Sequence, residues 1–152
     1  MRRSDKKIEN RDELTGIMLA GKIIRVAFAD SEPYVLPFNY AFDRDRIFIH
    51  CAREGRKLDI IKKDQRVAFE VSVDTGTIEA EQPCKFGFKY RCVIGKGAAR
   101  FSTDINEITK GLDLIMKQIS GKVRNIYDPD MLSKTGMIII VIKELSGKKS
   151  GY

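Results

Sequence analysis

The sequence is poor in the residues that build metal sites and nucleophilic active sites. It contains one histidine, His50, and three cysteines, Cys51, Cys84 and Cys92, no two of which are spaced as C-x-x-C. A zinc site needs several such ligands, and one histidine without a nucleophile-elbow motif does not suggest a Ser-His-Asp triad. An odd number of cysteines favours reduced thiols in a reducing compartment. The sequence therefore argues against a bound metal and against hydrolysis by a serine triad.

Long apolar runs are also missing. No run approaches the roughly 18 residues that a membrane-spanning helix needs, and the basic start at residues 1–7 lacks the apolar centre of a signal peptide. At 152 residues, with 43% hydrophobic and 32% charged residues, the composition is typical of a folded domain with a core. We therefore expect one cytoplasmic domain over residues 1–152, without a membrane partner and with loose tails at 1–10 and 146–152.

The charge balance is basic. The formal net charge is +7, from 28 lysines and arginines against 21 aspartates and glutamates, which favours an anionic partner. The cations are scattered in short clusters, as on an ordinary solvated surface. The aromatic residues Tyr34, Phe38 and Tyr40 lack the interleaved basic residues of a single-stranded nucleic-acid binder. We therefore expect a small-molecule substrate and no nucleic acid.

Apolar periodicity predicts about six strands and three or four helices. The strands mostly follow one another through short turns, which favours a mainly β protein, an antiparallel barrel with peripheral helices, over a doubly wound parallel sheet. Gly21 is expected to end the first helix in a left-handed conformation. The predicted strands are 23–29, 34–42, 46–50, 67–73, 84–101 and 137–142; the predicted helices are 10–21, 58–63 and 102–121, with a turn or helix start at 128–130 and a polar loop at 74–81.

The stretch 33–57 has the strongest functional pattern. Pro37 lies inside a predicted strand and cannot donate to a ladder, so it marks an ordinary edge strand, a bulge or a backbone that faces a ligand. The next strand leads to Gly55, Arg56 and Lys57 at the predicted start of a helix. Two cations and free helix N–H groups suit a phosphate dianion. The sequence therefore predicts a phosphate site at residues 55–57.

Several segments also occur in the order typical of one protein family. They are Met1–Arg3, Pro33–Tyr40, His50–Lys57, Lys89–Gly97 and Ser146–Lys148. With them the chain resembles the pyridoxamine 5′-phosphate oxidase-like flavoproteins, in the branch related to nitroimidazole-resistance proteins. The resemblance implies an FMN-binding split β-barrel, mostly antiparallel, which forms a homodimer with flavin at the subunit interface.

The resemblance also implies which residues contact the cofactor. Two of them, Cys51 and Cys92, stand where many relatives have serine, and a thiol is a weaker phosphate donor than a hydroxyl. The implied residues are Leu36, Pro37, Phe38, Asn39 and Tyr40 against the flavin ring; Gly55, Arg56 and Lys57 at the phosphate; His50, Cys51 and Ala52 along the approach; and Tyr90, Arg91 and Cys92, from the same or the partner subunit.

Two side chains near this site admit two interpretations each. His50 is either a packed, hydrogen-bonded residue or a catalytic group beside the flavin that binds substrate or carries a proton. Cys51 is either an inert buried thiol or a reactive one whose pKa the helix start lowers. The resemblance implies an FMN-dependent oxidoreductase for a small planar or anionic acceptor such as a nitroaromatic. Two alternatives stay open: a flavin- or haem-binding protein for storage or sensing, with His50 as the haem ligand, and a small basic barrel that binds single-stranded nucleic acid.

Overall fold

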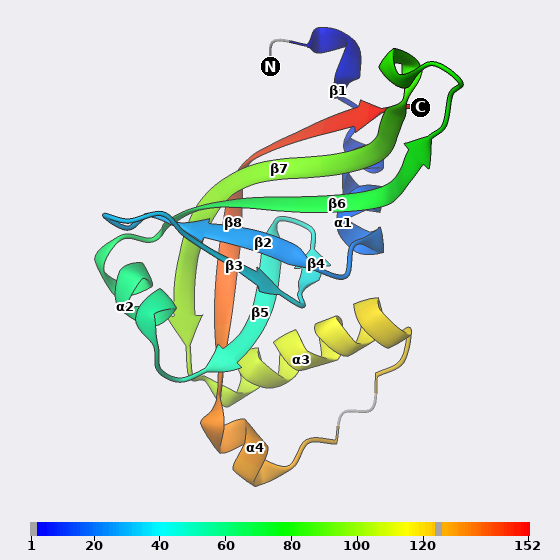
Figure 1. Ribbon diagram of the computed structural model, residues 1–152. Helices are drawn as coiled ribbons and strands as arrows, with labels where there is room; N and C mark the ends of the chain where they lie inside the picture. Colours follow the sequence, from blue (N-terminus) through cyan, green and yellow to red (C-terminus); the bar gives the residue numbers. More distant parts are fainter. Residues whose placement is uncertain (1–2, 124–125) are drawn as a thin grey trace.

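The computed structural model describes residues 3–123 and 126–152 (Figure 1). Eight strands form one sheet within these ranges. They are β1 (Lys7–Ile8), β2 (Ile24–Phe28), β3 (Tyr34–Phe38), β4 (Ala41–Asp43), β5 (Arg46–Ala52), β6 (Arg66–Ile78), β7 (Gly87–Ser102) and β8 (Thr135–Ser150). The helices are α1 (Arg11–Ala20), α2 (Arg56–Lys63), α3 (Ile105–Ser120) and α4 (Pro129–Lys134), with 3-10 turns at Ser4–Lys6 and Pro83–Lys85.

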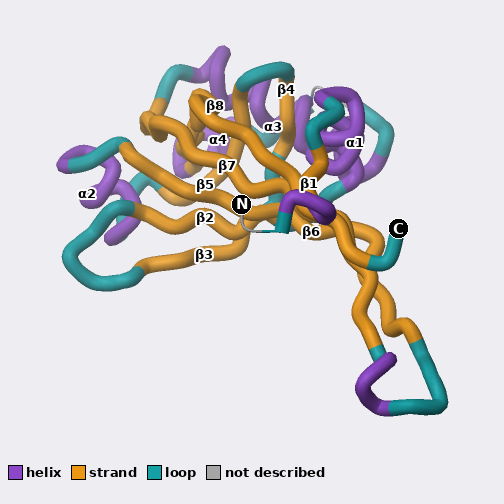
Figure 2. The backbone as a smooth tube through the Cα atoms, turned by 90° about the horizontal axis from the view of Figure 1, so that it is seen from above, coloured by secondary structure: helices purple, strands orange, loops and turns teal. Residues whose placement is uncertain are grey.

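The sheet is antiparallel throughout its described pairings and strongly coiled. Its strand order is β3-β2-β6-β7-β8-β5-β4, with β1 added to β8. β3 and β4 form the two ends of this path and do not pair with each other, so the barrel stays open. α2 lies on one side of the barrel and α1 on the opposite side in both views (Figures 1 and 2). The predicted class, mainly antiparallel β with peripheral helices, is confirmed.

Side-chain alternation along the strands divides the core into two clusters. Ile47 and Ile49 of β5 face the barrel interior, whereas Phe48 between them packs under α3. The start of β8 is buried on both faces, since Ile138 and Ile140 belong to the interior and Met137 and Ile139 to the α3 cluster. This two-sided burial explains why the sequence of β8 begins with a continuous apolar run instead of an alternating pattern.

Short polar side chains define where the helices begin. Asn10 accepts hydrogen bonds from the backbone N–H groups of Asp12 (2.8 Å) and Glu13 (3.0 Å), and Asp104 caps α3 in the same way. Asp128 accepts hydrogen bonds from two amides at the start of α4, so the predicted turn or helix start at 128–130 is a helix start. These caps lie within two residues of the predicted starts at 10, 102 and 128.

Gly21 follows α1 for a different reason from the one predicted. Its backbone is extended, with φ −64° and ψ 144°, so the predicted left-handed conformation is wrong. A Cβ atom at this position would lie 2.4 Å from Cγ1 of Val71 and 2.6 Å from the hydroxyl of Tyr40. Close packing, and not backbone handedness, therefore requires glycine here.

The predicted strand 34–42 is divided into β3 and β4 because the chain changes edges of the sheet between them. The side-chain amide of Asn39 donates to the carbonyl of Lys22 at 3.0 Å, and the Tyr40 hydroxyl donates to the carbonyl of Met18 at 2.6 Å. These contacts hold the two connecting residues against the end of α1 and the segment that follows it. The apolar pattern of the sequence continues from β3 into β4, but the backbone pairing with β2 ends at Phe38, so the predicted single strand is two strands.

The predicted loose tails are wrong for most of their described residues; residues 1–2 lie outside the described ranges. β8 continues to Ser150, paired with β7, and β1 pairs Lys7 and Ile8 with Lys148 and Gly147. Ile8 is only 2% exposed. The polar loop is shorter than predicted as well, because β6 extends to Ile78. These mostly polar segments are held by hydrogen bonds between backbones. Such pairing cannot be predicted from the spacing of apolar residues.

The far ends of β6 and β7 form an arm that projects from the barrel (Figure 2). Its base is fastened where Arg91 Nε donates to Asp74 at 2.7 Å and the Tyr152 hydroxyl donates to the Asp74 carbonyl at 2.8 Å.

Among the described residues, no helix combines the length and apolar character that a bilayer crossing requires.

Candidate functional site

β3 is an edge strand, one of the three interpretations that Pro37 allowed. Pro37 lies opposite Arg25 of β2, and none of the described strands pairs with the other side of β3. Leu36 and Phe38 are half-buried against the barrel interior, while Val35 (57% exposed) and Pro37 face outward. The strand therefore presents a free backbone edge together with half-buried apolar side chains, as the predicted ring contacts require.

Tyr40 differs from the other predicted ring contacts. Its side chain is fully buried, and its hydroxyl is bonded to the carbonyl of Met18. Burial raises the pKa of Tyr40 well above its ordinary value. Tyr40 therefore belongs to the core and is not an accessible ring contact in this chain.

The start of α2 has the geometry of an anion site. Gly55 is the N-cap residue, with φ +118° and ψ 162°, a conformation open mainly to glycine, and it has no side chain with which to cap the helix. Its carbonyl accepts from the amides of Leu58 and Asp59 at 2.8 and 3.4 Å. The amides of Arg56 and Lys57 precede any intrahelical acceptor. Two donors at the positive end of the helix dipole are therefore left for an external acceptor.

Arg56 is already occupied by other groups of this chain. Its guanidinium donates to one oxygen of Asp30 at 2.9 and 3.2 Å and lies 4.7 Å from the centre of the Tyr34 ring. The hydrogen bonds from Arg56 are the main reason that the pKa of Asp30 is lowered. Arg56 thus joins α2 to the turn between β2 and β3, a contact between residues far apart in the sequence that no local pattern indicated.

Lys57 is the available cation at this helix start. It is half-buried, and its ammonium group makes no hydrogen bond or ion pair with the residues that the structure describes. Its charge acts on Cys51, whose side chain packs against the barrel core. Burial raises the pKa of the Cys51 thiol, and Lys57 only partly opposes that rise. This favours the inert interpretation of Cys51.

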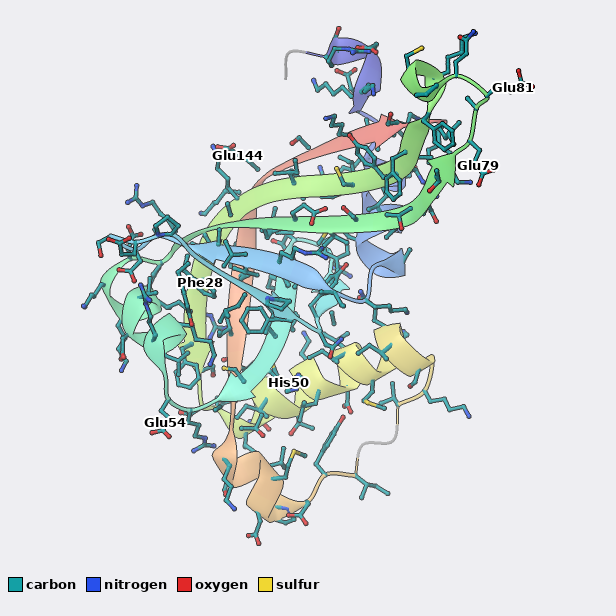
Figure 3. All side chains as sticks on the ribbon, viewed as in Figure 1. Phe28, His50, Glu54, Glu79, Glu81 and Glu144 are labelled. Carbon is teal, nitrogen blue, oxygen red and sulfur yellow. The ribbon has the colours of Figure 1, made fainter. Side chains whose placement is uncertain are left out.

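His50 and Cys51 point to opposite faces of β5, since successive side chains of a strand alternate. Figure 3 shows His50 near the C-terminal end of β5, with Glu54 in the segment that leads to α2. His50 is exposed and makes no hydrogen bond or ion pair within the described ranges, so the packed, hydrogen-bonded interpretation does not hold. Partial burial of the ring lowers the pKa of His50. Its imidazole is therefore accessible and neutral at pH 7.

The pKa of His50 gives a direct prediction. Because the chain has a single histidine, one imidazole resonance should titrate in a proton NMR experiment, with a midpoint below about 6.5. The folded state then binds fewer protons than the unfolded state between the two pKa values. The contribution of His50 to stability is therefore complete above the unfolded-state pKa and declines as pH falls toward the folded-state pKa. A midpoint at or above 6.5 would contradict the described environment.

Tyr90, Arg91 and Cys92 lie elsewhere in the chain, at the base of the arm. Cys92 is buried opposite Lys148, and the Lys148 ammonium lies 5.8 Å from the centre of the Tyr90 ring. Ala98 of β7 pairs with Arg66, just after α2. Tyr90 is eight residues along the strand from Ala98, a distance of about 26 Å at the usual rise per residue. Tyr90, Arg91 and Cys92 therefore do not lie at the start of α2 of the same subunit.

Most of the remaining predicted residues lie on neighbouring elements. Leu36, Pro37 and Phe38 lie on β3, with Asn39 just after it; Cys51 and Ala52 end β5, and residues 55–57 begin α2. The charge of Lys57 acts on Cys51, and Arg56 contacts Tyr34 at the start of β3. Asp30 and Tyr34 were missed by the sequence analysis, although both contact Arg56. Arg53 was missed in a similar way. Its guanidinium donates to the carbonyls of Thr135 and Leu132 at 3.0 and 3.2 Å and so anchors the segment before α2 to α4 and β8.

The fold and this cluster agree with a comparison against protein families. The model of the pyridoxamine 5′-phosphate oxidase family matches residues 10–149, nearly the whole chain, and the protein belongs to this family. A search of curated proteins finds no match to the chain.

Solved structures with the same fold point in the same direction. One, from Bacteroides thetaiotaomicron, is described as a candidate 5-nitroimidazole antibiotic resistance protein; it has a TM-score of 0.82 and 21% identity, and the match covers 94% of this chain and 86% of that one. A flavocytochrome of Azotobacter vinelandii has a TM-score of 0.83 and 19% identity over 100% of this chain and 72% of that one. An FAD- and haem-binding protein of Mycobacterium smegmatis has a TM-score of 0.82 and 18% identity, covering 97% and 74%. At these identities the comparisons establish a shared fold.

Proposed function

We propose that this protein binds FMN, with the phosphate at the start of α2. The observation that carries the proposal is the uncapped helix N-terminus at Gly55 beside the unpaired, half-buried Lys57. A Cβ atom at Gly55 would have only the Lys57 ammonium nearby, at 3.8 Å, so the approach to the free amides is open. Family membership and flavin binding by proteins of the same fold support this choice of anion.

The flavin ring would then lie along the free edge of β3. Leu36, Pro37, Phe38 and Asn39 offer backbone groups to its polar edge, and Leu36 and Phe38 add half-buried apolar side chains. Edge strands present unpaired N–H and C=O groups, which suit the alternating donors and acceptors of such a ring. In this arrangement the chain positions the cofactor by backbone contacts and supplies no nucleophile.

The site is completed in a homodimer. Along β7, Tyr90 lies about 26 Å and Cys92 about 20 Å from Ala98, which pairs with Arg66 just after the end of α2, so we infer that these residues join the site from a second copy. A two-fold axis would use the same surfaces twice and create two equal sites. The projecting arm, with Phe86 and Phe88 more than half exposed, offers a surface that such a partner would cover.

We further infer an FMN-dependent oxidoreductase that acts on a small planar or anionic acceptor such as a nitroaromatic. When bound, FMN supplies the electron transfer, and the protein supplies orientation and access. His50 is accessible and neutral at pH 7, so its imidazole can accept a hydrogen bond or a proton from a substrate placed beside it. Cys51 has no role in the chemistry, because its thiol stays protonated.

The absorption spectrum of freshly purified protein tests the cofactor first. We expect a yellow protein whose released cofactor is FMN, and whose bound flavin is bleached anaerobically by NADH, NADPH or an added reductase. Reoxidation by a nitroaromatic should then be slower in His50→Ala, while FMN occupancy is unchanged. A colourless protein that fails to take up added FMN would contradict flavin binding. Equal reoxidation rates with every acceptor would remove His50 from the chemistry.

A second candidate function is storage or sensing with flavin or haem. It is favoured by the unpaired, exposed His50, a possible axial ligand, and by the flavocytochrome and the FAD- and haem-binding protein that share this fold. The two functions differ in the same experiment. A Soret band that is lost in His50→Ala, or a flavin that neither NADH, NADPH nor an added reductase bleaches, would favour this second candidate over the oxidoreductase.

A further inference from the structure

A second cavity lies on the side of the barrel away from α2. It has a volume of about 330 Å³ and is enclosed by α1, the turn between β4 and β5, and β8. These three elements lie side by side in both views, with α2 on the other side (Figures 1 and 2). The base of the cavity is apolar and is formed by Leu14, Phe42, Ile142 and Leu145.

The rim of this cavity carries uncompensated positive charge. Arg11, Arg44 and Lys143 line it, and none of them forms an ion pair or hydrogen bond with the described part of the chain. Two carboxylates also line the cavity, but each has a cation of its own. Glu9 pairs with Lys7 at 2.8 Å, and Asp45 lies 3.8 Å from Arg46. The three rim cations are therefore left without a counterion.

Two backbone irregularities converge on the same rim. Arg44 has φ +61° in the two-residue turn between β4 and β5, a left-handed conformation that favours glycine. The pairing of β7 with β8 shifts register where Lys96 faces Glu144 and Gly97 faces Ile142, so Lys143 is the extra residue of a bulge. Bulges redirect side chains and recur next to functional sites. Arg44, in the left-handed turn, and Lys143, in the bulge, are two of the three unpaired cations at this rim.

We propose that this cavity is a binding site for a small amphiphilic anion, that is, a carboxylate or phosphate attached to a short apolar body. The head group would meet Arg11, Arg44 and Lys143 at the rim, and the apolar body would rest on Leu14 and Phe42. A volume near 330 Å³ is at the small end of the range of ligand sites, which favours a short body over a long lipid chain. The site is separate from α2 and does not depend on flavin binding.

Titration of octanoate into ¹⁵N-labelled protein, saturated beforehand with FMN, tests the site. We expect saturable shifts of the amide signals of Leu14, Thr15 and Phe42. Inorganic phosphate and 1-octanol, which each offer half of the required chemistry, should bind at least tenfold more weakly. Octanol binding as tightly as octanoate, or no saturable shift with octanoate at these amides, would overturn the proposal. The same titration without FMN should give the same affinity.

A set of variants makes the assignment specific. Arg44→Gly removes a rim cation and also relieves the left-handed backbone, so we expect octanoate affinity to fall at least tenfold with no decrease in melting temperature. Lys143→Met should lower affinity similarly. Lys85→Ala removes an exposed cation from the arm and serves as the matched control for net charge. Wild-type affinity in Arg44→Gly, or an equal loss in Lys85→Ala, would show that the cavity is not the site.

Discussion

Lys57→Met is expected to weaken FMN binding by roughly ten- to a hundredfold, because a charge-assisted hydrogen bond is worth about 1.5–3 kcal/mol. Lys57 has no competing partner among the described residues, so its full interaction is available to a phosphate. Arg56→Met should cost much less. To reach the phosphate, Arg56 must give up two hydrogen bonds to Asp30 and its contact with the Tyr34 ring. The loss of these contacts offsets most of the binding free energy that Arg56 would gain from the phosphate.

Fluorescence quenching of FMN titrated into apoprotein would measure these differences. Lys62→Met is the matched control, because Lys62 lies on the exposed face of the last turn of α2 and pairs with Asp59 at 3.5 Å. It should bind FMN like the wild type. If Lys57→Met also binds like the wild type, the phosphate does not lie at the start of α2. If Arg56→Met has the larger effect, Asp30 does not compete for the arginine.

A mixture of two inactive variants is expected to recover FMN binding if the site is shared between subunits. One variant carries Arg56→Met and Lys57→Met, and the other carries Tyr90→Ala and Arg91→Ala. In a heterodimer, one site collects all four substitutions and the other collects none. With random exchange of equal amounts, half of the dimers are mixed, so about a quarter of all sites should be intact.

Equilibrium dialysis with FMN before and after subunit exchange would count these sites. Melting temperatures of the two separate variants provide the folding control, since Arg91 also holds Asp74 at the base of the arm. No recovery in a mixture of two folded, dimeric variants would contradict the shared site, because residues that act within one chain cannot complement each other. A monomer that binds FMN fully would contradict the dimer itself.

Much of the fold follows from local patterns in the sequence. The helices predicted from 10 and 102 begin at the caps Asn10 and Asp104, and the predicted turn or helix start at 128–130 is a helix start. Pro37 lies on an edge strand, one of the three possibilities that it left open. The errors at the two tails and at the polar loop share a physical cause, because these segments are held by backbone pairing. Gly21 and the strand 34–42 were mispredicted for other reasons, close packing and a change of sheet edge. The polar end of β8 and the short β1 form a ladder with little hydrophobic pattern, so they were predicted to be loose.

The candidate site was predictable only where its residues are neighbours in sequence. Gly55, Arg56 and Lys57 are consecutive, so the sequence alone predicts a cationic helix start at this point. The difference between the two cations was not visible, because the partner of Arg56 is Asp30, 26 positions away. The second cavity was missed for the same reason, since its three cations come from α1, a turn and a bulge that only the fold brings together.

The arm of β6 and β7 also gives the protein a selective attachment point for a reporter dye. Cys84 lies in the 3-10 turn between these strands and is exposed, whereas Cys51 is half-buried and Cys92 is buried. Burial raises the pKa of both of the latter thiols, and maleimides react with accessible thiolate. A fluorophore would therefore go to the arm of the natural sequence without any cysteine replacement. Its anisotropy and emission colour would then follow, in real time, how the arm is covered when subunits associate.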